Sequence, residues 1–300
     1  MFKEMTVFVD AHLHTVRKKG LPRNAADSNY TTPEELIVMM DHTGVDRGIL
    51  LPLISPESSF QLSTTEDVLE VCESYPDRFY PFCNVDPRAG AHTPDADLSF
   101  HLNFYKHQGC LGVGELTASL EFTDPLVQNL FHHCERCEMP VLFHLAPQRY
   151  GNYGLIDKLG LSGLEASLQA FPNLIFIGHS SAFWSEISGA VNDEKRNQYP
   201  SGPVEAGGAV PRLMANYRNL YCGWDATSGF NGLTRDPEFG WSFMERFKDR
   251  ILFGTDICDP LVPHRHADYL RTSFGEGRIS REAFENISWR NANRPFALGL

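Results

Sequence analysis

The sequence predicts an α/β fold: a single-domain (β/α)8 TIM barrel over residues 1–300, with long loops at its active-site end. Two observations predict it. Strand-like and helix-like segments alternate eight times, and the strands start about 30–45 residues apart, which is typical of βαβ units in a parallel sheet. Several strands end in a histidine or an acidic residue, and catalytic residues gather at the carboxyl ends of barrel strands. No internal repeat interrupts the pattern.

The first predicted strand ends in two histidines. It begins at Val7 and runs through Asp10 and His12 to His14. Side chains two apart on a strand share a face, so these three polar groups should project the same way. Two imidazoles with a carboxylate behind them are well suited to bind a transition metal.

The next elements follow in order. A long polar loop over 15–30 precedes a helix that should begin at Thr32-Pro33-Glu34-Glu35, a capping box with proline at the first helical position. A second capping box, Ser162-x-x-Glu165, should start a later helix. Further strands are expected at 48–51, 79–85, 110–116 and 220–225, and helices at 65–75, 97–107 and 204–217, after Asp124 and Asp236, and from Ser280. The segments 180–203 and 258–278 should be irregular.

Three later strands repeat the pattern of the first. A continuous apolar run of four to six residues predicts a buried strand of a parallel sheet. Each run ends in a possible metal ligand: Val141–Phe143 in His144, Ile175–Gly178 in His179, and Ile251–Thr255 in Asp256.

The composition narrows the classes of protein. With 42% hydrophobic residues the chain can fill a core, but no apolar stretch reaches the roughly 18 residues of a membrane span. No N-terminal stretch is typical of a signal peptide, because the first strand starts almost at once. The net charge of −12 disfavours nucleic-acid binding. Seven dispersed cysteines indicate no disulfide framework, so a cytoplasmic location is expected, with Cys134 and Cys137 packed in the core. Assembly into a homo-oligomer stays open.

The ordered set of Asp10-x-His12-x-His14, His144, His179 and Asp256 resembles the amidohydrolase superfamily over nearly the whole chain. The segment Ile287-x₃-Asn291-Ala292-x-Arg294-x-Phe296 is similar to the last helix of the amidohydrolase-related branch, which includes aminocarboxymuconate-semialdehyde decarboxylase. The resemblance implies a metal-dependent barrel enzyme.

The resemblance and the ligand chemistry give the strand-end residues roles. Neutral nitrogens for a divalent metal, most suitably Zn²⁺, would come from His12, His14 and His144. Asp256 could bind the metal and accept a proton from its bound water. His179 could polarise a substrate carbonyl or bind a second metal, and Asp10 could orient a ligand histidine.

Glu115 ends the predicted fourth strand. In TatD-type nucleases and some other binuclear members of the superfamily, a carboxylate at this place bridges two metals, whereas the decarboxylase branch lacks one. The resemblance therefore implies metal contact for Glu115 and leaves open one or two ions. A buried, hydrogen-bonded glutamate is the alternative.

Loops at the carboxyl end of the barrel should contact a small-molecule substrate. The candidates are Arg149 and Tyr150 after His144, and Trp184 after His179. Basic residues of the first loop could receive a substrate carboxylate or could simply be solvated: Arg17, Lys18 and Arg23. His264 and His266 are weaker candidates.

The function expected is hydrolysis of an amide, ester or lactone bond of a small, carboxylated molecule by a metal-activated water. The alternative is a metal-dependent, non-hydrolytic decarboxylase of an aromatic or unsaturated acid. A binding protein that keeps the barrel is a third possibility, but retention of every ligand-type residue argues against it. The acidic net charge argues against a nuclease, although Glu115 keeps that alternative open.

Overall fold

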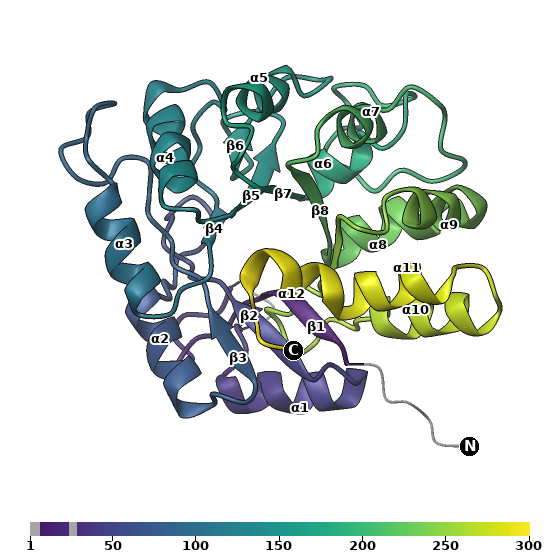
Figure 1. Ribbon diagram of the computed structural model, residues 1–300, viewed down its shortest axis with the longest axis horizontal. Coiled ribbons are helices and arrows are strands. Elements are labelled where there is room, and N and C mark those ends of the chain that lie inside the picture. The colour runs from purple at the N-terminus through teal and green to yellow at the C-terminus, as the bar shows by residue number, and fades with distance from the viewer. Residues whose placement is uncertain (1–6, 24–28) are drawn as a thin grey trace.

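The structure is a computed structural model that describes residues 7–23 and 29–300. Within them, eight parallel strands form the barrel and helices surround it (Figure 1). The barrel strands are β1 (Val9–Leu13), β2 (Arg47–Leu50), β3 (Phe79–Pro81), β4 (Val113–Leu116), β5 (Val141–Ala146), β7 (Phe176–His179), β8 (Leu220–Trp224) and β9 (Ile251–Phe253).

Two isolated parallel bridges close the circle. The ladders join β1-β2-β3 and β4-β5-β7-β8-β9. Cys83 pairs with Val113 between β3 and β4, and Leu13 pairs with Ile257 next to β9. A short strand, β6 (Leu155–Ile156), adds to the outer end of β5. The predicted (β/α)8 fold is therefore confirmed.

The helices occupy most of the predicted segments. They are α1 (Pro33–Thr43), α2 (Thr65–Ser74), α3 (Ser99–His107), α4 (Pro125–Arg136), α5 (Ser162–Ala170), α6 (Ser181–Ser185), α7 (Ala209–Asn216), α8 (Ala226–Thr234), α9 (Pro237–Arg246), α10 (His266–Gly275), α11 (Arg281–Glu285), the π-helix η1 (Asn286–Arg290) and α12 (Asn291–Phe296). Two segments predicted as irregular contain helices, α6 and α10, and α8 was not predicted at all.

The two predicted capping boxes had different outcomes. At α1, Thr32 accepts a hydrogen bond from the backbone N–H of Glu35, and the Glu35 carboxylate accepts one from the Thr32 N–H, 3.0 Å away. At α5 the prediction is wrong, because Ser162 already lies inside the helix. Asp157 instead accepts hydrogen bonds from two N–H groups of the first turn. The carboxylate of Asp157, in the loop between β6 and α5, thus takes the role predicted for Ser162.

The barrel interior is apolar at the amino end of the strands. Its buried cluster includes Val9, Phe82, Leu142 and Leu252, and Phe296 of α12 packs on Phe82 at 5.3 Å between ring centroids. The α12 helix, yellow in Figure 1, therefore covers the amino end of the barrel and leaves the carboxyl end for polar side chains.

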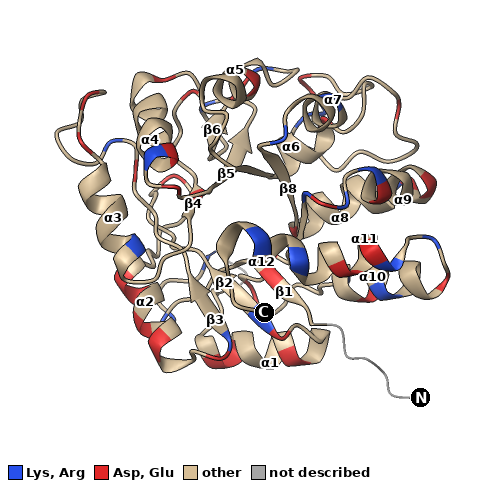
Figure 2. Ribbon diagram, viewed as in Figure 1, with Lys and Arg blue, Asp and Glu red and all other residues tan. Residues whose placement is uncertain are grey.

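A larger apolar cluster lies between the strands and the helices, and it includes Cys134 and Cys137 as predicted. All seven cysteines are free. In the described part of the chain no helix has the length and apolar character needed to cross a membrane. Acidic and basic residues are spread over the outer helices, with acidic residues prominent on α1 and α2 (Figure 2).

The segment after α6 is held to the barrel by a buried ion pair. The Arg196 Nε atom lies 2.6 Å from Glu186 Oε1, and both side chains are 1% exposed. Arg196 also donates to the carbonyl of Asp157 at 2.6 Å. This ion pair anchors a loop that forms one wall of the barrel mouth.

Replacing Arg196 should therefore destabilise the protein by releasing this loop. We expect Arg196→Met to lower the free energy of unfolding by about 3–5 kcal/mol, because it leaves a buried carboxylate without its cation. The control, Arg212→Met, removes an exposed ion pair with Glu165 and should cost less than about 1 kcal/mol. Urea denaturation measures both, and equal losses would contradict the assignment.

Candidate metal centre

Every ligand residue expected from the sequence lies at the carboxyl end of the barrel, where the side chains converge. They come from the ends of five strands or the residues just after them: His12, His14, Glu115, His144, His179 and Asp256. All but His144 and Asp256 are buried, and those two are only partly exposed. The residues that end the predicted strands in the sequence thus form a single site in the folded protein.

The first group of ligand atoms surrounds one point. The Nε2 atoms of His12 and His14 are 2.9 Å apart, and Glu115 Oε2 lies 3.7 and 3.3 Å from them. Asp256 Oδ1 lies 3.6 Å from each of the two nitrogens. Four ligands bound tetrahedrally to one zinc ion at about 2.1 Å would lie about 3.4 Å apart. The donor set and its spacing therefore fit a divalent metal.

A second group shares Glu115 with the first. Its other oxygen, Oε1, is 2.7 Å from His144 Nδ1 and 3.6 Å from His179 Nε2. Asp256 also serves both groups, since its Oδ2 lies 3.8 Å from His179 Nε2. Each oxygen of Glu115 thus faces a different pair of histidines.

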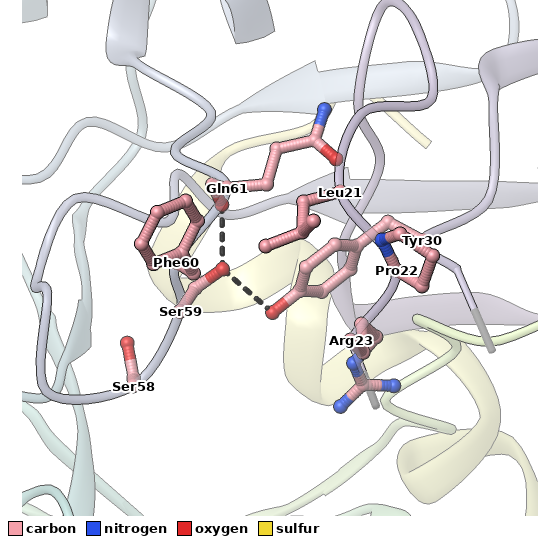
Figure 3. Close-up of a pocket in the computed structure, with 8 residues that line it drawn as sticks. All are labelled: Leu21, Pro22, Arg23, Tyr30, Ser58, Ser59, Phe60 and Gln61. Atoms are coloured by element: carbon pink, nitrogen blue, oxygen red, sulfur yellow. Dashed lines mark hydrogen bonds between the residues drawn. The ribbon is translucent and has the colours of Figure 1, made fainter. Parts of the chain in front are cut away.

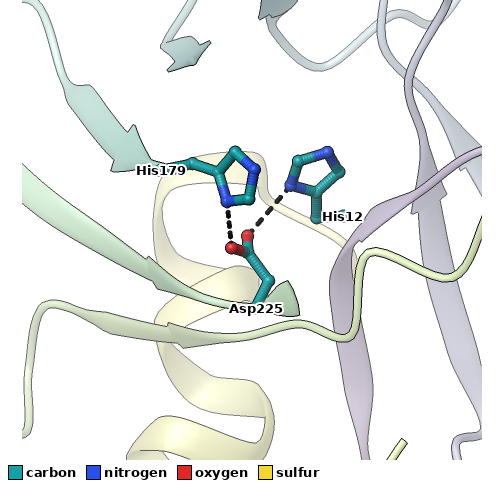
Figure 4. A group of neighbouring side chains, drawn as sticks. All are labelled: His12, His179 and Asp225. Carbon is teal, nitrogen blue, oxygen red and sulfur yellow. Dashed lines mark hydrogen bonds and ion pairs between the residues drawn. The ribbon is translucent and has the colours of Figure 1, made fainter. Parts of the chain in front are cut away.

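Asp225, which follows β8 directly, orients two of these histidines (Figure 4). Its Oδ2 accepts a hydrogen bond from His12 Nδ1 at 2.9 Å, and its Oδ1 accepts one from His179 Nδ1. His14 Nδ1 donates to the carbonyl of Leu51 at 2.9 Å. With the proton on Nδ1, all three rings turn an Nε2 lone pair toward the cluster, as metal ligation requires.

This role of Asp225 was not predicted from the sequence. The signal was present, because the run from Leu220 ends in Asp225 just as the run from Ile251 ends in Asp256. Nothing in the sequence, however, indicates that a carboxylate after β8 reaches rings on β1 and β7.

Asp10 does not take the role expected for it. Its Oδ1 accepts from the backbone N–H of His12 at 2.9 Å, and its Oδ2 accepts from the Thr255 hydroxyl at 2.5 Å. The β1–β2 register shifts between Asp10 and Leu13, so the strand does not alternate regularly through this stretch. Burial raises the pKa of Asp10 to about 7. Asp10 thus joins β1 to the segment after β9, and Asp225 orients the histidines in its place.

The chain after β9 approaches the cluster closely. A Cβ atom at Gly254 would lie 2.8 Å from the Cβ of Asp225, so only glycine fits there. Asp256 has a left-handed backbone, with φ of 55°, which is uncommon for a residue with a side chain. This local geometry brings the Asp256 carboxylate to the ligand atoms.

The electrostatics of the cluster favour a bound cation. Burial alone would raise the pKa of Glu115, but the three imidazoles beside it, of His12, His14 and His144, hold that pKa well below its usual value. Burial alone would also raise the pKa of Asp225, and the charges of His179 and His12 lower it instead. Burial would lower the pKa of His12, yet Asp256 and Asp225 raise it well above its ordinary value. The carboxylates therefore stay ionised in a desolvated site and require positive charge beside them.

Of the predicted substrate contacts, one is buried in the core and two are exposed on a loop. Trp184 is 1% exposed, and its indole donates to the carbonyl of Gly223. This core position removes Trp184 from the candidate substrate contacts. Arg149 and Tyr150 are exposed on the loop after β5, whereas Tyr153 of the same loop packs on His144, with 4.3 Å between ring centroids. Tyr153 was thus not among the residues predicted from the sequence.

Among the basic residues of the first loop and the two histidines of the last loop, some lie at the ligand cluster and others lie away from it. Arg17 points outward and pairs with Glu70 at 2.6 Å, and Lys18 is exposed. Arg23 lines the cavity that contains His14, Glu115 and Asp256. His264 lines a separate cavity against α1, and His266 is buried, with its Nε2 3.0 Å from the carbonyl of Ala226.

No protein-family sequence profile and no curated protein sequence matches this chain. Solved structures do. A probable 2-pyrone-4,6-dicarboxylic acid hydrolase from Acinetobacter baumannii matches with a TM-score of 0.60 at 16% identity, over 97% of this chain and 99% of its own. A 5-carboxyvanillate decarboxylase from Sphingomonas paucimobilis gives 0.61 at 14%, over 97% and 99%. A zinc-bound amidohydrolase from Burkholderia multivorans gives 0.61 at 12%, over 97% and 99%.

These matches confirm the expected structural resemblance to barrels of the amidohydrolase superfamily, at low sequence identity. The fold is shared by a hydrolase and a decarboxylase, so it does not decide the reaction. The decision depends on the chain's own site.

The role of Asp225 can be tested through metal affinity. We expect Asp225→Asn to keep the fold but to weaken zinc binding by about 10–100-fold, because an amide orients the two rings less well. Competition with a chromogenic chelator gives the affinity. Asp249→Asn, which makes the same change at an exposed position before β9, is the control. Parental affinity in Asp225→Asn would exclude the orienting role.

Proposed function

We propose that the chain is a metal-dependent hydrolase of the amidohydrolase superfamily, which cleaves an amide, ester or lactone bond of a small, carboxylated molecule. The observation that carries this proposal is the position of Glu115. Its two oxygens face two different groups of histidines, the arrangement expected of a carboxylate between two cations. Paired metal ions favour hydrolysis, because they can hold both an attacking water and the reacting group.

The residues fit zinc or a similar divalent ion. Imidazole nitrogens and carboxylate oxygens are its usual ligands, and here they come from His12, His14, Glu115 and Asp256, with His144 and His179 at the second position. A bound metal ion would lower the pKa of a water ligand toward about 7. Metal loading would also compensate the buried carboxylates.

The protein side chains would then handle the proton and the substrate. Asp256 is partly exposed toward the cavities and can accept a proton from the attacking water and pass it to the leaving group. With both of its ring nitrogens facing carboxylates, His179 is better placed as a ligand than as a carbonyl-polarising acid. Tyr153 lies beside His144, where its hydroxyl could contact a substrate.

Decarboxylation of an aromatic or unsaturated acid is the second candidate. The likeness to the 5-carboxyvanillate decarboxylase favours it. A screen of lactones, esters and amides against aromatic acids, run on zinc-loaded protein, separates the two reactions. Release of CO2 without net consumption of water would overturn the hydrolase proposal.

The metal count tests the role of Glu115. The parent protein, purified without chelator, should hold about two equivalents of metal, and Glu115→Gln should hold about one, because an amide does not bridge two cations. Elemental analysis gives the content. Glu121→Gln changes an exposed glutamate just after β4 and serves as the control. Equal metal content in the parent and in Glu115→Gln would show that Glu115 does not bridge two metal ions.

Asp256 should separate metal binding from chemistry. In Asp256→Asn we expect most of the metal to remain while kcat falls about 10²–10⁴-fold, since an amide cannot accept the proton. Metal content and kcat are measured on the same preparation, with a substrate found in the screen. Full metal together with near-parental kcat would require another base.

A further inference from the structure

Two chambers adjoin the ligand cluster, each lined by a different part of it. An inner cavity of about 40 Å³ is lined by His14, Glu115 and Asp256. It shares Arg23, Tyr30 and Ser58 with an outer cavity of about 250 Å³ (Figure 3), and we call the two together the arginine chamber.

The second chamber, of about 280 Å³, is lined by His144, His179 and Asp256 and by uncharged polar side chains that include Asn152 and Asn197. We call it the amide chamber. Asp256 and Tyr153 belong to the walls of both chambers. The ligand cluster thus adjoins both a chamber with a guanidinium and a chamber whose other described lining residues are uncharged.

The inner cavity limits what can reach the cluster. A volume of about 40 Å³ holds roughly two or three water molecules. It can therefore accept the reacting group of a substrate but not a whole molecule, and the remainder must extend into a larger chamber.

Arg23 is held in place at the junction of the inner and outer cavities. Its guanidinium carbon lies 4.7 Å from the ring centroid of Tyr30, and its Nη1 donates to Cys258 Sγ at 3.1 Å. The Tyr30 hydroxyl donates to Ser59 at 2.9 Å, which fixes the ring (Figure 3). Such an ordered guanidinium is preorganised to bind a carboxylate through two hydrogen bonds.

The ion pair of Arg23 is longer than those of Arg17 and Lys19 on the same loop. The Asp259 carboxylate lies 3.9 Å from Nη1, beyond hydrogen-bond distance. By contrast, Arg17 and Lys19 of the same loop point outward and pair closely with Glu70 and Glu35.

We propose that Arg23 is the carboxylate-binding residue of the active site and that it sets the orientation of the substrate. The anionic part lies in the arginine chamber, the bond to be cleaved lies at the ligand cluster, and an uncharged polar part occupies the amide chamber. This rests on the proposed function and adds the substrate class: a small acyl compound with a carboxylate on one side only of the scissile bond. A decarboxylase substrate would have only CO2 on the far side of the bond that breaks, so it would not fill the amide chamber with an uncharged polar group.

The chemical step balances with water alone. The oxygen of water bonds to the acyl carbon, and the bond from that carbon to oxygen or nitrogen breaks. Of the two protons of water, one ends on the leaving oxygen or nitrogen, and the other is released from the new carboxylic acid. No oxidant or reductant is needed.

Simple carboxylates test the proposal on zinc-loaded protein. Butyrate can occupy the metal alone, whereas a dicarboxylate of suitable length can reach both the metal and Arg23. We expect one member of the series from malonate to adipate to bind more tightly than butyrate. Arg23→Met should weaken that dicarboxylate about 10–100-fold and change butyrate less than about threefold, because only the dicarboxylate loses a charged hydrogen bond. Calorimetry gives the affinities.

Three further variants serve as controls. Arg17→Met makes the same change on the same loop and should alter neither ligand, and Arg23→Lys should recover part of the dicarboxylate affinity. Asn197→Asp adds a negative charge to the amide chamber and should not affect the dicarboxylate. A large loss in Asn197→Asp would place the carboxylate in the wrong chamber and overturn the proposal.

Two other outcomes are equally decisive. If Arg23→Met holds full zinc and binds the dicarboxylate as the parent does, the assignment of Arg23 fails while the metal centre stands. If the parent holds no zinc, the metal centre fails, and the substrate orientation fails with it. Thermal unfolding of each variant confirms that it is folded.

Discussion

The structure at the barrel mouth depends on the burial of carboxylates among imidazoles. Asp225 is fully buried and touches two rings, and Glu115 is in contact with all four histidines of the cluster. Carboxylates removed from water are costly unless cations or donors face them. Each histidine therefore has one nitrogen committed to orientation or to Glu115, and the arrangement is complete only with positive charge at its centre.

The same constraint explains the backbone around the site. Asp225 fits only because Gly254 has no side chain, and Asp10 fits because Thr255 offers both its N–H and its hydroxyl. The segment after β9 thus leaves room for one buried acid, Asp225, and donates two hydrogen bonds to another, Asp10, before it brings Asp256 to the cluster. The candidate metal centre and the closure of the barrel between β1 and β9 use the same few residues.

The sequence predicted what depends on local pattern and missed what depends on tertiary contact. Runs of apolar residues that end in His144, His179 and Asp256 were sufficient to predict strands and ligands, because a barrel gathers its strand ends at one place. The partner of a ligand ring cannot be predicted so, since Asp225 lies 213 residues from His12. Folding also decides shorter contacts that a pattern does not show: Asp157 rather than Ser162 caps α5, and Tyr153 rather than Tyr150 packs at the site. In each case the deciding contact joins different elements.

Charge connects the site to the rest of the molecule. The chain carries a net charge of −12, and acidic residues are prominent on α1 and α2 near the first loop. A small anion approaching this surface is repelled at long range, although salt screens such repulsion beyond about 8–10 Å. Attraction must therefore come from groups within the mouth itself. Arg23, turned inward while its neighbour Arg17 pairs with Glu70 outside, provides it. The outer ion pairs thus neutralise part of the acidic surface, and the one inward guanidinium of this loop gives the entrance its selectivity.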